Sequence, residues 1–181
     1  VTGTDPYTIT ALEEPVRFHD GNPMTPTDIE YSFERWLVQD RDGGGQWTFY
    51  YPVLNTYGAN TTDPNFGHLI DQHIESNATH VIIHLDNNFP ETSFLQILSQ
   101  ASAGIVEKTW AERLGDFDGI WSIPWNDGTP NSIVARWHNP ASSFIEDHMM
   151  GTGPYKFDYW QHGTAYSIIK NDAYWDGFPA L

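Results

Sequence analysis

VRFHDGNPMTPTDIEYSF, residues 16–33, contains the strongest helix start in the chain. Thr25 can cap a helix, Pro26 suits its first position, and Asp28 completes a capping box. An apolar face then follows at spacings of four, seven and eight residues, formed by Ile29, Phe33, Trp36 and Leu37. The pattern predicts a helix over residues 26–38, with Glu30 and Glu34 facing solvent.

Other elements are predicted on both sides of this helix. Alternation of apolar and polar residues predicts strands at 7–12, 16–18 and 79–85. Helical spacing predicts a helix from Pro90 to about Ser99, with Phe94, Leu95 and Leu98 buried, and a second at Glu107–Leu114. Residues 116–139, rich in Trp, Pro, Gly and Asn, are expected to be irregular. Strands at 155–160 and 164–171 form a predicted hairpin, with Gly163 at a positive φ.

Residues 40–67 contain Gly43–Gly45, Pro52 and Pro64, and this composition predicts a loop. The loop carries an aromatic cluster of Trp47, Phe49, Tyr50 and Tyr51. Such rings either drop into the core or form a pocket wall that accepts varied side chains, and the sequence leaves both interpretations open.

The composition limits the possible classes of protein. The chain has 181 residues, 39% of them hydrophobic, which is enough for a real core. Its formal charge of −16 would repel nucleic acid and anionic lipid, so no nucleic-acid partner is expected. The lack of cysteine excludes disulfides and thiolate metal sites. A start on Val1 and an end on Leu181 suggest a piece excised from a longer protein.

Metal-binding patterns in the sequence are incomplete. His80 and His84 have the spacing of a zinc pair on a helix, but the predicted strand would separate them by about 13 Å. Residues 40–45 begin like a calcium loop, yet Tyr51 stands where a bidentate Glu is required. We therefore predict neither a metal site nor a cofactor.

Catalytic patterns are equally weak. Ser32 and Thr152 lack the surroundings of a nucleophile. Carboxylate pairs such as Asp116 with Asp118, or Glu13–Glu14, could hydrolyse a glycan, but nothing in the sequence fixes their separation. The sequence predicts no catalytic residue and no enzyme.

Three stretches in order resemble the extracellular solute-binding proteins of family 5, the oligopeptide, dipeptide and nickel-binding group. Residues 16–33 look like that family's V-K-F-H-D-G-x-P-h-T-A-x-D-V-x-Y-S-F segment, and residues 89–106 resemble P-x-x-x-F-L … A-x-I-V. Residues 151–157 and 170–181, GTGPYKF and KNDAYWDGFPAL, resemble G-T-G-P-Y-K-F … R-N-P-x-Y-W-x-G-K-P-A-L. The resemblance runs from about Val16 to the last residue.

The resemblance implies an α/β chain that forms a partial lobe of a type II periplasmic-binding-protein fold, with mixed sheets flanked by helices. Residues 1–100 would form a first-lobe subdomain containing the helix at 26–38 and the aromatic loop. Residues 101–181 would be an adjoining segment that ends in the hairpin. The second lobe would lie beyond Leu181.

The resemblance also implies a function. The full-length protein would be the monomeric substrate-binding component of an ABC importer, capturing oligopeptides or similar solutes outside the cytoplasmic membrane and delivering them to a membrane permease. By family position, the ligand-binding residues expected in this chain are Trp47, Tyr50, Gln100 and Ser102. A membrane anchor is expected in the full-length protein. The alternatives are a surface glycan hydrolase and a cell-surface module without a transport role.

Overall fold

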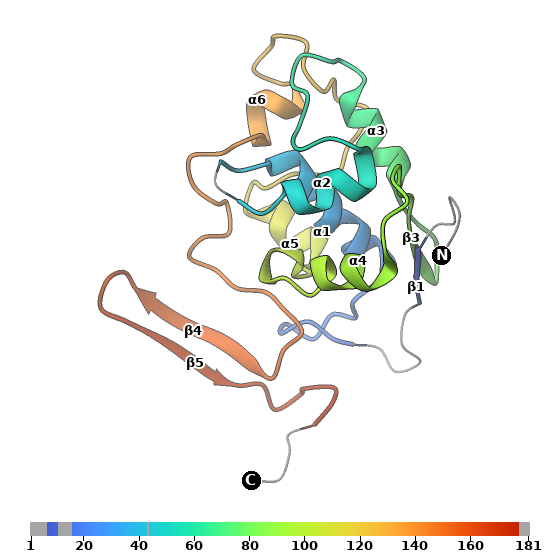
Figure 1. The fold of residues 1–181 in the computed structure, drawn as a ribbon. Coiled ribbons are helices and arrows are strands. Elements are labelled where there is room, and N and C mark those ends of the chain that lie inside the picture. Colours follow the sequence, from blue (N-terminus) through green and yellow to red (C-terminus); the bar gives the residue numbers. More distant parts are fainter. Residues whose placement is uncertain (1–6, 11–15, 43, 178–181) are drawn as a thin grey trace.

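Helix α1, Pro26–Gln39, runs through the middle of the main body of the protein (Figure 1). The computed structural model describes residues 7–10, 16–42 and 44–177. The Thr25 hydroxyl accepts a hydrogen bond from Asp28 N, and the Asp28 carboxylate accepts one from Thr25 N at 2.9 Å. The capping box and the helix predicted over residues 26–38 are therefore confirmed.

The hydrophobic core is built on the apolar face of α1. Phe33 and Trp36 lie against Phe49, with ring centroids 5.4 Å and 5.0 Å apart, and Phe49 contacts Phe94 at 6.1 Å. Such contacts add about 0.5–1.5 kcal/mol per pair beyond the burial of area. The opposite face differs from the prediction, because Glu34 is only 4% exposed.

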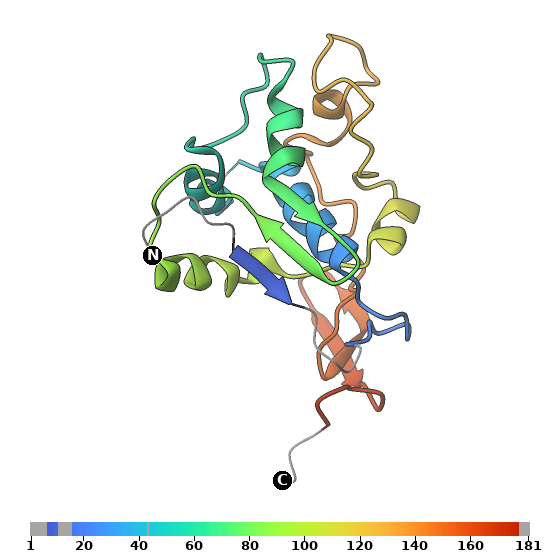
Figure 2. The same cartoon turned by 90° about the vertical axis from the view of Figure 1, so that its right-hand side faces the viewer.

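A small antiparallel sheet packs beside α1, in the order β1-β3-β2 (Figure 2). Its strands are β1, Tyr7–Thr10, β2, Ile74–Ser76, and β3, His80–Ile83. Val81 and Ile83 of β3 are fully buried. The strand predicted at 7–12 is confirmed over residues 7–10, since residues 11 and 12 lie outside the described residues, and the strand predicted at 79–85 is confirmed over residues 80–83. The sequence analysis missed β2.

The strand predicted at residues 16–18 is wrong. Arg17 makes only an isolated antiparallel bridge with Pro23 across the turn. The turn instead fixes His19, whose N donates to Gly151 O at 2.9 Å and whose Nε2 lies 3.1 Å from Gly153 O. The turn at residues 19–21 thus fixes the position of residues 151–154, far along the chain.

The loop predicted for residues 40–67 is also wrong, because it contains α2, Trp47–Leu54, and the first two residues of α3, Phe66–His73. Pro52 lies inside α2, where a proline removes one helical hydrogen bond. Burial of Phe49, Tyr50 and Val53 at 0% exposure compensates for that loss. Tertiary packing therefore outweighs the local preference of this segment.

Short helices follow on the same body. They are α4, Glu91–Leu98, the 3₁₀ turn η1, Ala101–Ala103, α5, Lys108–Arg113, and α6, Ile133–Trp137. Phe94 is buried as predicted, but Leu95 is 54% exposed and Ile97 takes its place in the core. Residues 116–139 are irregular as predicted, apart from α6. Within the described residues, no helix combines the length and hydropathy that a membrane span needs.

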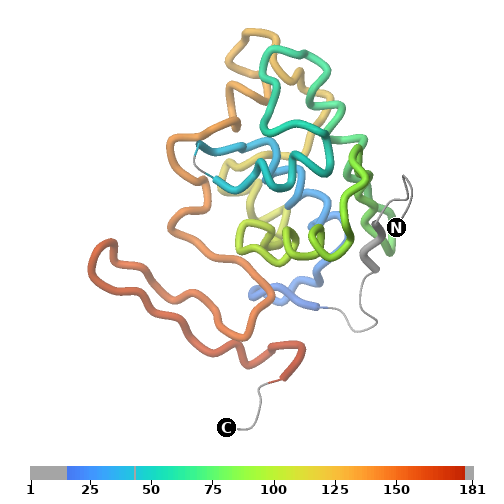
Figure 3. Tube along the Cα trace, in the orientation of Figure 1, coloured from blue at the N-terminus to red at the C-terminus, as the bar shows by residue number. Residues whose placement is uncertain are grey.

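After α6 the chain leaves the body and runs to the predicted hairpin, which projects away from it (Figure 3). Its strands are β4, Tyr155–Gln161, and β5, Ala165–Lys170, and Gly163 has a φ of 71°. A two-stranded hairpin is marginal on its own. This one exposes large apolar side chains, namely Tyr155, Tyr159, Trp160, Tyr166, Ile168 and Ile169.

Replacing Thr25 with alanine should lower the free energy of unfolding by about 1 kcal/mol, because the cap of α1 is lost. Urea denaturation followed by tryptophan fluorescence measures the change. Thr27→Ala is the matched control, since Thr27 is exposed on the first turn of α1. Equal midpoints for the two variants would contradict a stabilising role of the cap.

Candidate functional site: a groove between α2 and α4

A groove of about 280 Å³ lies where α2 packs against α4. Its walls are aromatic, aliphatic, hydroxyl and amide side chains, and none of them is charged. We call it the α2–α4 groove, lined by Trp47, Thr48, Tyr51, Phe89, Ser93, Gln96, Ile97 and Gln100. In a chain with a formal charge of −16, an uncharged surface of this kind suits a neutral ligand group.

Two of the residues expected to bind ligand, Trp47 and Gln100, line the groove, and Trp47 is 54% exposed. Ser102 is exposed on η1 beside them. A Cβ placed on Gly45 would lie 3.5 Å from Gln100 Oε1 and 4.0 Å from Ser102 Oγ. The structure therefore brings Trp47, Gln100 and Ser102 to one place, around a glycine that leaves room between them.

Tyr50, the fourth expected residue, is in the core. It is 0% exposed, and its hydroxyl donates to Leu37 O at 2.5 Å. Burial, and secondarily Asp40, raise the pKa of the Tyr50 phenol. The Tyr50 ring packs against Phe66 of α3, with ring centroids 6.1 Å apart, whereas Trp47 and Tyr51 line the groove. We therefore leave Tyr50 out of the site.

The sequence analysis missed Tyr51, Gln96 and Ser93 as lining residues. A helical reading of residues 47–54 would have placed Tyr51 one turn after Trp47, and Gln96 is likewise one turn before Gln100. The wrong assignment of residues 40–67 as a loop hid the first of these relations. The relation between Gln96 and Gln100 matters only because α4 packs against α2, and no local sequence pattern predicts that packing.

The carboxylates considered above as catalytic candidates do not line the groove. Asp116 and Asp118, considered above as a hydrolytic pair, are each bound to a different arginine, Arg35 at 2.7 Å and Arg136 at 3.6 Å. Glu13–Glu14 lies outside the described residues. In the part of the chain that the structure describes, no three His, Asp or Glu side chains are placed to hold a metal ion.

One carboxyl group is strongly perturbed. Burial, and secondarily Glu30, raise the pKa of Glu34 to about 9, although a hydrogen bond from Trp121 opposes the shift. Glu34 lines a separate acidic hollow together with Glu30 and Asp71. At neutral pH this carboxyl group is therefore protonated.

Residues 4–181 match the family model of bacterial extracellular solute-binding proteins, family 5 middle. The chain belongs to this family. The oligopeptide-binding protein OppA of Bacillus subtilis (strain 168) is 23% identical over 170 residues, which cover 94% of this chain and 26% of that protein. The chain thus spans about a quarter of the length of that relative.

Solved structures show the same fold. The pheromone receptor PrgZ matches with a TM-score of 0.60 and 14% identity, over 97% of this chain and 29% of that one. The substrate-binding domain of an oligopeptide ABC transporter from Bacillus anthracis str. Ames matches with a TM-score of 0.58 and 14% identity, over 97% and 28%. The family 5 chain is therefore a partial type II periplasmic-binding-protein fold, as expected.

Proposed function

We propose that the full-length protein is the substrate-binding component of an ABC importer, which captures oligopeptides or similar small solutes outside the cytoplasmic membrane. The observation that carries the proposal is the α2–α4 groove, where Trp47, Gln100 and Ser102 gather at an uncharged surface. A family 5 relative is named an oligopeptide-binding protein, which supports a peptide ligand. The protein would act as a monomer, deliver its ligand to a membrane permease and catalyse no reaction.

The groove would form one wall of the ligand site. The other wall would belong to a second lobe that closes over the ligand by a hinge. On closure the exposed indole of Trp47 would leave water and stack on a ligand side chain. The amide of Gln100 and the hydroxyl of Ser102 would hydrogen-bond to the peptide backbone, which is common to all peptides. This arrangement would tolerate varied ligand side chains.

A longer protein also accounts for the hairpin. The rings of Tyr159, Trp160 and Tyr166 are 51%, 43% and 74% exposed, and a two-stranded hairpin is marginally stable on its own. The hairpin base is held by Lys156, whose Nζ donates to His19 O at 2.7 Å, so its position is defined. We infer that other parts of the full-length protein cover the hairpin. The chain alone, which supplies only one wall of the proposed ligand site, would bind ligand poorly.

Trp47→Ala in the full-length protein should weaken peptide binding about 2- to 12-fold, which corresponds to the loss of about 0.5–1.5 kcal/mol of stacking. Isothermal titration with tri- to pentapeptides measures the change, and parallel titrations with sugars and Ni²⁺ test the ligand class. The melting temperature should stay nearly constant, because the indole is 54% exposed.

Ile120→Ala is the control, because it truncates a 48% exposed apolar side chain that does not line the groove. It should leave peptide affinity unchanged. The groove assignment fails if Trp47→Ala keeps wild-type affinity for every peptide that binds. It also fails if that variant melts at a much lower temperature, which would make Trp47 a structural residue.

A further inference from the structure

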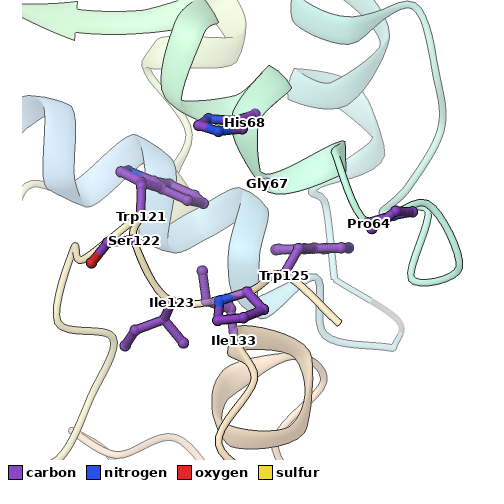
Figure 4. Close-up of a pocket in the computed structure, with 9 residues that line it drawn as sticks. Pro64, Gly67, His68, Trp121, Ser122, Ile123, Trp125 and Ile133 are labelled. Atoms are coloured by element: carbon purple, nitrogen blue, oxygen red, sulfur yellow. The ribbon is translucent and has the colours of Figure 1, made fainter. Parts of the chain in front are cut away.

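A second hollow, of about 200 Å³, lies between the start of α3 and the irregular segment before α6 (Figure 4). It shares no lining residue with the α2–α4 groove. We call it the tryptophan hollow, lined by Pro64, Gly67, His68, Trp121, Ser122, Ile123, Pro124, Trp125 and Ile133. The proposed transport function makes no use of it.

Both indole rings of the hollow are held by their N–H groups. Trp121 Nε1 donates to Glu34 Oε1 at 3.0 Å, and Trp125 Nε1 donates to Asn60 O at 3.0 Å. The N–H groups are therefore used inside the protein, and the rings offer a ligand only their apolar surfaces. Trp125 is 3% exposed and forms the floor, whereas Trp121 is partly exposed and forms a wall.

The backbone around the rings is fixed as well. Ile133 N donates to Pro124 O at 3.0 Å and Val134 N to Trp125 O at 2.9 Å, which joins the tryptophan segment to α6. A Cβ on Gly67 would lie 3.1 Å from Trp125 Cε3 and 3.3 Å from Trp121 Cζ3. The glycine thus lets both indoles approach the backbone of α3. The hollow is formed before any ligand binds, which lowers the entropic cost of binding.

The rim carries polar groups. The His68 side chain is 65% exposed, and its Nδ1 lies 3.9 Å from Asp71 Oδ2. Figure 4 shows the imidazole on the α3 side of the hollow, near Trp121. A ligand ring seated on the indoles would meet a hydrogen-bonding edge there. A purely apolar ring would leave this edge unused.

The charges nearby argue against a charged ligand. A formal charge of −16 disfavours an anion. A cation would be drawn to the adjoining acidic hollow, which shares Trp121 as a wall. That hollow already contains the Lys108 ammonium group, 5.9 Å from the centre of the Tyr31 ring. The chain therefore supplies its own cation, and a neutral ligand fits the tryptophan hollow best.

We propose that the tryptophan hollow binds one hexose unit of a saccharide. One face of a pyranose ring is lined by C–H groups and can lie on the Trp121 indole, while its hydroxyl groups reach His68 at the rim. The volume suits a single ring, since it falls below the range of about 300–1,000 Å³ typical of larger ligands. The site is independent of the peptide groove, so the protein can hold both ligands at once.

Saturation-transfer difference NMR on the full-length protein tests the proposal. The probes are the methyl glycosides of glucose, galactose, mannose and N-acetylglucosamine, each at millimolar concentration. At least one should show transfer to its ring C–H protons, and Trp121→Ala should weaken that binding at least tenfold. Because Trp121→Ala also removes a hydrogen bond to Glu34, His68→Ala serves as a second variant, which should weaken binding at least threefold without a change in melting temperature.

His148→Ala is the matched control, since His148 is exposed and does not line the hollow. It should leave the saccharide signal unchanged. No transfer to any of the four glycosides overturns the proposal. So does saccharide binding of unchanged strength in His68→Ala, a signal abolished by a saturating peptide, or transfer to N-acetyl-proline amide in place of the glycosides. Failure of these tests leaves the Trp47 result untouched, because the two sites share no residue.

Discussion

Asp116→Ala is expected to lower the free energy of unfolding by about 3–5 kcal/mol, because it leaves Arg35, whose side chain is only 14% exposed, without its partner. The Asp116 side chain is 0% exposed, and its Oδ2 lies 2.7 Å from Arg35 Nη2. Its oxygens also accept hydrogen bonds from Arg35 Nε at 2.7 Å, Gln39 Nε2 at 2.6 Å and Phe117 N at 2.8 Å. One carboxylate thus joins two turns of α1 to the irregular segment.

Urea unfolding, with the midpoint and the slope recorded separately, measures the loss. Asp118→Ala is the matched control, because Asp118 and Arg136 lie 3.6 Å apart with 23% and 42% of their side chains exposed. Exposed pairs contribute about 0–1 kcal/mol. If both aspartate variants lose the same small amount, the Asp116 network does not hold the segment to α1.

The elements that could be predicted from the sequence are those with local signals. The capping box of Thr25 and Asp28, and Gly163 in the hairpin turn, depend on residues a few positions apart. Their elements lie within one or two residues of the prediction. The two family-like segments at residues 16–33 and 151–157 also have a structural role, because they contact each other: the His19 side chain binds the carbonyl of Gly153.

The errors arise where distant packing decides. No local pattern shows that Phe49, Tyr50 and Val53 become fully buried, so a segment containing Pro52 looked like a loop and is a helix. Trp47 and Tyr50, expected by family position to contact ligand, both lie on this helix. Tyr50 packs into the core, and of the two only Trp47 stays on the surface.

The burial of the Glu34 carboxyl group could not be predicted from the local sequence pattern either. The helical spacing of α1 places Glu34 on the polar face, and that placement predicts an exposed carboxylate. The structure covers it with Trp121, which lies 87 positions away and donates to Glu34 Oε1. A carboxyl group buried in this way changes how the stability of the protein depends on pH.

The free energy of unfolding should therefore fall as the pH rises from about 4.5 to 9. This fall is due to the Glu34 carboxyl group, and Glu34→Gln should remove it. Burial, followed by repulsion from Glu30 and Asp71, raises the pKa of Glu34 from 4.5 to about 9, while the Trp121 hydrogen bond and Lys108 act in the opposite direction. In this range the folded protein keeps a proton that the unfolded chain releases. Each pH unit then costs the folded state at most about 1.4 kcal/mol.

Below pH 4.5 the Glu34 side chain is neutral in both states, so the wild type and Glu34→Gln should unfold at similar urea concentrations. Above pH 4.5 the free energy of unfolding of the variant should increasingly exceed that of the wild type, by several kcal/mol near pH 9. The reason is that a glutamine carbonyl can still accept the Trp121 N–H without carrying charge. The measurement is urea unfolding of both proteins at each pH unit from 4 to 9. Glu91→Gln makes the same chemical change on the exposed first turn of α4 and is the control. If the stability difference between wild type and Glu34→Gln does not grow with pH beyond that of the control, the buried carboxyl group is ionised in the folded protein and this account of its environment is wrong.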